Sequence, residues 1–130
     1  GQRSNPIMSS LAINLSPAEI EQLSTYFAAQ PAEPNSAFKA DPQQRALGEQ
    51  LAKAGNCAAC HGAELQGQAM FPRLSGQGYD YLVKQLNDFK SGKRTDATGS
   101  MAPVVAALSE QDISHLATYL ASHQGADNEQ

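Results

Sequence analysis

The stretch "GNCAACHG", residues 55–62, decides how the rest of the chain is interpreted. It holds both cysteines of the 130-residue sequence, separated by two residues and followed directly by His61. A disulfide between Cys57 and Cys60 would close too small a loop to stabilise a fold. We therefore expect these side chains to serve chemistry rather than to cross-link the chain.

Two cysteines at this spacing, followed by a histidine, form the haem-attachment pattern of c-type cytochromes. The two thiols can reach the vinyl groups on one edge of a porphyrin and form thioethers, which would hold the next histidine beneath the iron. A thioredoxin-like dithiol needs an alternating strand and helix pattern, and a zinc site needs further ligands at suitable spacing; neither is present. The sequence therefore predicts a haem c on Cys57 and Cys60, with His61 as an iron ligand.

The composition is consistent with a small protein that fills its core with a bound group. Hydrophobic residues make up 41% of the chain, but aromatic residues only 6%, and tryptophan is absent. The net charge of −4 and the lack of a basic cluster argue against a nucleic-acid partner. No apolar run is long enough to form a transmembrane segment.

Hydrophobic periodicity and capping residues predict an all-α fold with four helices and no strand. The expected helices cover residues 16–29, 42–54, 79–91 and 109–122. The first and last begin with the same capping box, Ser16 with Glu19 and Ser109 with Asp112. A proline-containing stretch at 31–41 reads as a linker, and the glycine-rich segment 62–78 as a loop around the bound group.

Met101 is the best candidate for the sixth iron ligand. It lies in a loop before the last helix, and Pro103 stiffens that loop. Met70 is interpreted as a packing residue, and His115 and His123 as surface residues of the last helix. A histidine and methionine pair would raise the reduction potential relative to two histidines.

Pro72 is the most informative residue of the loop. Its carbonyl can accept a hydrogen bond from the ring nitrogen of His61 that does not face the iron, which would orient the imidazole. The alternative is that Pro72 only stiffens the loop.

The start of the chain repeats its end. Aligning Met8 with Met101 without gaps pairs Leu15 with Leu108, Ser16 with Ser109, Ile20 with Ile113, Leu23 with Leu116, and Thr25-Tyr26 with Thr118-Tyr119. Upstream, "GQRSNP" at 1–6 resembles "GKRTDA" at 92–97 after a two-residue gap. Capping and periodicity do not explain the shared methionine and Thr-Tyr pair, so we interpret the match as an internal repeat.

On these motifs, residues 41 to about 123 resemble a class I c-type cytochrome, and in particular the dihaem cytochromes c4 of bacterial periplasms. The resemblance implies a helical domain wrapped around the haem, Met101 as axial ligand, and a helix crossing at Gly48 and Tyr119. It also implies two such domains in tandem. Family members are not enzymes but pass single electrons from a quinol-oxidising complex to a terminal oxidase or a similar partner.

The resemblance divides the chain into four parts. Residues 1–30 are expected to be the end of a first haem domain, 31–41 the linker, 42–123 a complete haem domain, and 124–130 a flexible tail. Met8 would then ligate a second haem in a longer protein; the alternative is a natural one-haem protein with a degenerate leader. Residues 1–30 should dock on a missing N-terminal fragment, a second copy or the intact domain.

Two other functions are compatible with the sequence. The chain could be the haem subunit of an enzyme complex such as flavocytochrome c sulfide dehydrogenase. It could also be a gas-binding or peroxidatic haem protein, which would require an open sixth position at the iron.

Overall fold

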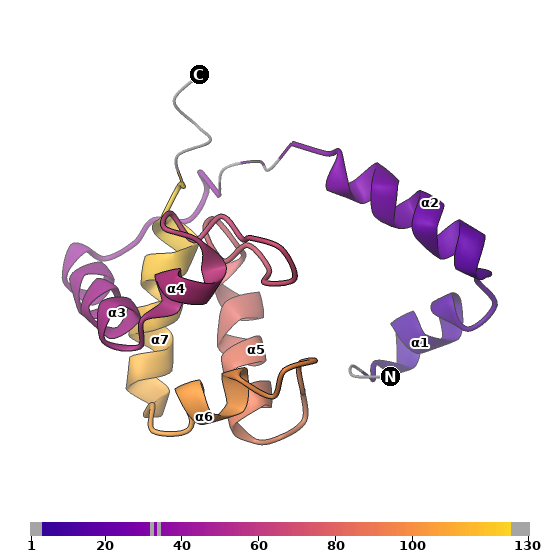
Figure 1. Ribbon diagram of the computed structural model, residues 1–130. Coiled ribbons are helices and arrows are strands. Elements are labelled where there is room, and N and C mark those ends of the chain that lie inside the picture. The colour runs from indigo at the N-terminus through magenta and orange to yellow at the C-terminus, as the bar shows by residue number, and fades with distance from the viewer. Residues whose placement is uncertain (1–3, 32, 34, 126–130) are drawn as a thin grey trace. The chain divides into compact units, whose positions relative to one another are not determined.

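The computed structural model describes residues 4–31, 33 and 35–125, and it divides into two compact units, residues 1–33 and 34–130. Within the described residues the fold is all-α, with an isolated bridge between Gln68 and Phe71 and no strand. The first unit holds α1 (Pro6–Ala12) and α2 (Pro17–Ala28). The second holds α3 (Pro42–Ala54), α4 (Cys57–His61), α5 (Tyr79–Lys90), α6 (Met101–Val105) and α7 (Glu110–Ser122), as Figure 1 shows.

The first unit consists of two capped helices whose apolar side chains are not covered. Asn5 caps α1, and Ser16 caps α2 in a full capping box with Glu19. Neither helix has a buried residue. Large hydrophobic side chains are exposed on both and on the turn between them: Ile7, Met8, Leu11, Ile13, Ile20, Leu23, Tyr26 and Phe27.

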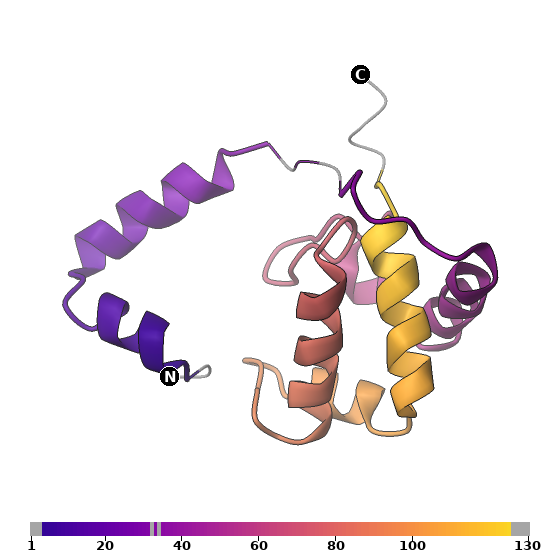
Figure 2. The ribbon, with the colours of Figure 1, turned by 180° about the vertical axis from the view of Figure 1, so that it is seen from behind.

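The second unit is built around the contact of α3 with α7, and α7 in turn packs against α5 (Figures 1 and 2). The α3–α7 contact is closest at Gly48. A Cβ atom on this residue would lie 2.0 Å from the carbonyl oxygen of His115 and 2.7 Å from Cβ of Tyr119. The two helices can approach this closely only because residue 48 has no side chain.

One hydrophobic core fills the second unit. Its buried members come mainly from the inner faces of α5 and α7, and α6 and the loop after α4 contribute Val105 and Leu65. Cys57 and Met101 are partly buried and pack against the same core. The core therefore brings together the segments that carry the two cysteines and the candidate methionine ligand.

The structure confirms the all-α class and the four expected helices, and it adds three short ones. Helices α1, α4 and α6 were not predicted, because segments of five to seven residues are too short to show helical periodicity. Met101, which we expected in a loop, is the first residue of α6. The predicted tail at 124–130 lies outside the described residues from position 126 onward.

Replacing Gly48 by alanine tests the helix crossing. In a helix interior this change normally stabilises by up to about 1 kcal/mol, but the new Cβ would collide with the backbone of α7. We expect the free energy of unfolding to fall by about 1–3 kcal/mol, measured by denaturant titration. Gly78→Ala is the matched control, since a Cβ there meets only Tyr81 Cβ at 3.8 Å. An equal loss in both variants would contradict the tight crossing.

Candidate functional site

The short helices α4 and α6 lie on the same side of the α5–α7 pair. Both are in front of that pair in Figure 1 and behind it in Figure 2. Helix α4 carries Cys57, Cys60 and His61, and α6 begins with Met101. Four of the five site residues predicted from the sequence therefore lie on one side of the core.

The two cysteines and His61 share a single turn of helix. Residues three and four positions apart lie on the same face of an α-helix, so Cys57 has both Cys60 and His61 on its side. Both cysteines are free thiols, Cys60 exposed and Cys57 partly buried. Burial raises the pKa of the Cys57 thiol, which favours its protonated form before any bond is made.

His61 is buried and already oriented. Only 5% of the residue is exposed, and its Nδ1 lies 2.7 Å from the carbonyl oxygen of Pro72. Because a carbonyl can only accept, Nδ1 carries the proton and donates. The lone pair of the neutral ring is then on Nε2, which is the form of histidine that binds a metal. The hydrogen bond expected for Pro72 is present.

The loop after α4 is shaped to present this carbonyl. Gly67 donates its N–H to the carbonyl oxygen of His61 at 2.8 Å and has a φ of 87°. A Cβ on Gly67 would lie 2.7 Å from the backbone nitrogen of Arg73. Leu65 is buried despite a φ of 56°, a conformation that non-glycine residues rarely adopt. The backbone of the loop is therefore strained, and its conformation keeps the Pro72 carbonyl within hydrogen-bonding distance of His61.

Met101 is partly buried, and its backbone is held by a carboxylate. Its N–H donates to Oδ2 of Asp96 at 3.0 Å. Oδ1 of the same carboxylate accepts from the backbone N–H and the hydroxyl of Thr98, at 3.0 and 2.6 Å, and from the N–H of Ser100 at 3.2 Å. The Thr98 hydroxyl, followed by the Met101 N–H, holds the pKa of the Asp96 carboxyl well below its usual range.

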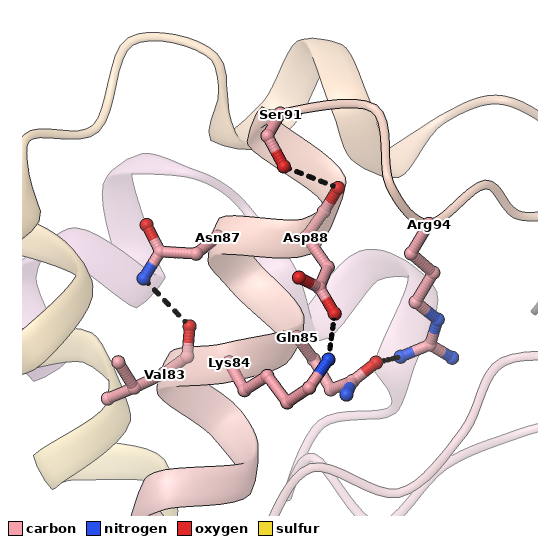
Figure 3. Close-up of polar contacts among 7 residues, drawn as sticks. All are labelled: Val83, Lys84, Gln85, Asn87, Asp88, Ser91 and Arg94. Carbon is pink, nitrogen blue, oxygen red and sulfur yellow. Dashed lines mark hydrogen bonds and ion pairs between the residues drawn. The ribbon is translucent and has the colours of Figure 1, made fainter. Parts of the chain in front are cut away.

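A second polar anchor ties the segment before Met101 to α5. Arg94 donates from Nη1 to Oε1 of the buried Gln85 at 2.6 Å, as Figure 3 shows. Its guanidinium also lies 4.6 Å from the ring centre of Phe89, and its backbone N–H donates to the carbonyl of Asp88. Arg94 therefore fixes the chain just after α5, seven residues before α6 begins.

The residues on this side of the core fit a covalently bound haem. The donor set comprises two free thiols on one helix turn, an imidazole with Nε2 available, and a methionine thioether. Soft sulfur and imidazole ligands suit a haem iron. Of the other candidates considered, Met70 is 69% exposed, and His123 lies beside Glu64 at 3.4 Å and over the ring of Tyr119.

Three functional candidates were missed from the sequence alone: Gln85, Arg94 and Asp96. Gln85 occupies a position on the inner face of α5 where periodicity predicts an apolar residue. Arg94 and Asp96 lie within "GKRTDA", which the repeat had already singled out. The repeat was therefore the signal that could have found the last two.

Replacing Arg94 by lysine tests the anchor on α5. Lysine keeps the positive charge but cannot both stack on Phe89 and donate to Gln85, which is left buried and unpaired. We expect a loss of about 1–2 kcal/mol in the free energy of unfolding of the haem-loaded chain, measured by denaturant titration. Lys93→Ala, an exposed neighbour, serves as the control and should behave as wild type. An R94K variant as stable as wild type would show that the charge alone suffices.

Comparison with known proteins identifies the family. Residues 45–124 match the family model for cytochrome c. A cytochrome c4 from Thiocapsa roseopersicina is 36% identical over 130 residues, which cover 92% of this chain and 66% of the relative. The Cbb3-type cytochrome c oxidase subunit CcoP of Rubrivivax gelatinosus is 38% identical over 111 residues, 84% of this chain and 34% of that protein.

Solved structures agree. The crystal structure of reduced recombinant cytochrome c4 from Pseudomonas stutzeri matches with a TM-score of 0.85 at 32% identity, covering 94% of this chain and 68% of the other. This chain spans no more than 66% of the length of the two relatives named above. Members of the family carry covalently attached haem c and transport electrons. The family match and the "CAACH" turn together show that this chain belongs to the cytochrome c family, and its sequence and fold are similar to those of cytochrome c4.

Proposed function

We propose that this chain is the C-terminal part of a two-haem, periplasmic electron carrier of the cytochrome c4 type, and that it does not itself transform a bound substrate. The observation that carries the proposal is the hydrogen bond from His61 Nδ1 to the Pro72 carbonyl. It leaves Nε2 of a buried imidazole available on the helix that also carries both thiols. This arrangement prepares an iron ligand before any metal is bound.

Each site residue has a distinct part in holding the haem. Cys57 and Cys60 would hold the haem through thioether bonds, and His61 and Met101 would ligate its iron. When bound, the haem supplies a one-electron couple at its iron. A neutral thioether together with an imidazole would favour the reduced state and give a higher reduction potential than two imidazoles would. Pro72 orients the His61 ring and raises its basicity by accepting the Nδ1 proton.

If the protein supplies both of these ligands, the iron would have no open position. This closed coordination suits a protein that passes electrons and does not bind small molecules at the metal. The fixed ligands and the apolar core beside them limit the rearrangement that accompanies each electron transfer. Electron transfer would then occur between the haem and a partner docked on the surface.

Residues 1–30 belong, in this proposal, to a preceding haem domain, with 31–41 as linker and 42–123 as the second haem domain. The support comes from the repeat: α2 and α7 begin with matching capping boxes, and Met8 and Met101 occupy matching positions. Met8, whose side chain is 60% exposed, would be the ligand of the other haem.

The partners would be other redox proteins of the periplasm, with a quinol-oxidising complex as donor and a terminal oxidase as acceptor. Similarity to an oxidase subunit supports the acceptor. Thioether attachment of haem takes place in the periplasm, which supports the compartment. Among the described residues, every helix is too short or too polar to cross a lipid bilayer.

A second function is a haem subunit built into an enzyme complex, as in flavocytochrome c sulfide dehydrogenase. The observation that favours it is the resemblance to CcoP, which is by its name a subunit of an oxidase. Purification of the chain from its native source distinguishes the two: a carrier is recovered free of catalytic subunits, and an enzyme subunit is recovered with them.

The test of the proposed site uses the chain produced with haem-attachment machinery. Wild-type polypeptide should keep its haem under denaturing conditions, seen as added mass, and Cys57→Ala with Cys60→Ala should not. The reduced wild-type protein should not bind carbon monoxide, because Met101 closes the sixth position. Met101→Ala should bind it.

Met70→Ala is the matched control, since this methionine is exposed. This variant should keep the covalently bound haem and, like the wild-type protein, should not bind carbon monoxide. Carbon monoxide binding by the wild-type protein would reject His/Met ligation and favour a gas-binding or peroxidatic haem. A polypeptide without added mass would reject covalent attachment.

A further inference from the structure

The backbone N–H of each candidate methionine ligand donates to an Asn or Asp side chain, and the repeat places these two side chains at the same position. In the second unit, Asp96 Oδ2 accepts from Met101 N at 3.0 Å. In the first unit, Asn5 Oδ1 accepts from Met8 N at 2.9 Å. The alignment of "GQRSNP" with "GKRTDA" pairs Asn5 with Asp96.

Ordinary helix capping explains this bond in the first unit but not in the second. Asn5 is the N-cap of α1, and its Oδ1 accepts from the N–H groups of Ile7 and Met8 in the usual capping arrangement. Helix α6 begins at Met101 itself, after Ser100, whose side chain makes no capping bond. The loop in the second unit is two residues longer. The local helix geometry therefore differs between the repeats, while the hydrogen bond to the methionine is the same.

The loop of the second unit is held at both ends. Arg94 fixes its start on α5 through Gln85, Phe89 and the carbonyl of Asp88. Asp96 then gathers the N–H groups of Thr98, Ser100 and Met101 onto one carboxylate. Between these contacts Gly99 has a φ of 67°, nothing lies within 4 Å of the place its Cβ would take, and its N–H donates to the backbone carbonyl of Asp96 at 3.2 Å.

We propose that Asp96 is a positioning residue that keeps the Met101 thioether on the iron by fixing the backbone of the ligand, and that Asn5 does the same for Met8. The inference rests on the proposed His/Met ligation. A thioether is a neutral, weak ligand. The fraction of the protein in which Met101 is bound to the iron therefore depends on how much conformational entropy the ligand loop loses when the bond forms. A preorganised backbone N–H bond reduces that loss.

The test is displacement of Met101 by imidazole in the oxidised, haem-loaded full chain. The readout is the red absorption band that iron(III) shows only with a methionine ligand. In Asp96→Ala we expect half-displacement at about tenfold lower imidazole, which corresponds to the loss of one hydrogen bond to a charged group. Asp96→Asn keeps an acceptor oxygen, as Asn5 does in the first repeat, and should stay nearer to wild type than to D96A.

Asp112→Ala is the matched control. Asp112 also accepts several hydrogen bonds, from the Ser109 N–H and hydroxyl in the capping box of α7, but it holds no ligand. D112A should lower the stability of the fold and leave the imidazole titration unchanged. If D96A does not fold, Asp96→Glu replaces it, since the longer side chain keeps the charge and displaces the acceptors.

The outcomes separate this inference from the proposed ligation. A wild-type protein without the methionine band overturns the ligation and the inference with it. A wild-type protein with the band, together with a D96A or D96E titration equal to wild type, overturns the inference alone. A shift in D112A as large as that in D96A also overturns it, because general destabilisation would then explain the effect.

Discussion

The close approach of α3 and α7 at Gly48 is the constraint on which the haem site depends. Only two residues separate α3 from α4, which carries the thiols and His61, and α6 ends shortly before α7 begins. Both ligand-bearing helices are therefore joined by short connections to the crossing pair. A wider separation of α3 and α7 would move α4 and α6 with them. The absence of one side chain on α3 thus sets the geometry of a site to which Gly48 contributes no chemical group.

The two proposed iron ligands are held in different ways. His61 is buried, lies on the same helix turn as the thiols, and is oriented by one hydrogen bond to a loop with several left-handed residues. Met101 is less buried and follows a loop that is fixed by polar contacts to Arg94 and Asp96. His61, the stronger ligand, is held by its burial and by its place beside the two cysteines that are proposed to bind the haem covalently. The weaker ligand is supported by a set of hydrogen bonds.

Most of the fold and the centre of the site could be predicted from the sequence. The long helices were predictable because their apolar stripes and capping boxes are local signals, and Cys57, Cys60 and His61 because their spacing is itself the chemistry. Helices α4 and α6 were not, since each is stabilised by its surroundings and not by its own five residues. Gln85 was missed because its role depends on a contact with Arg94 in another segment, and Asp96 because the sequence does not show that its carboxylate gathers the N–H groups before Met101.

The uncovered apolar faces of α1 and α2 affect how residues 4–31 can be ordered. Helices of this length are marginal in water even when well capped. A surface that covered Ile7, Leu11 and Phe27 would supply the free energy that keeps these helices formed, and folding and docking of this segment would then be one coupled equilibrium. Part of the contact free energy is used for ordering the chain, which lowers the affinity gained per unit of buried area. A contact of this kind would open more readily than one of the same buried area between parts that are already folded.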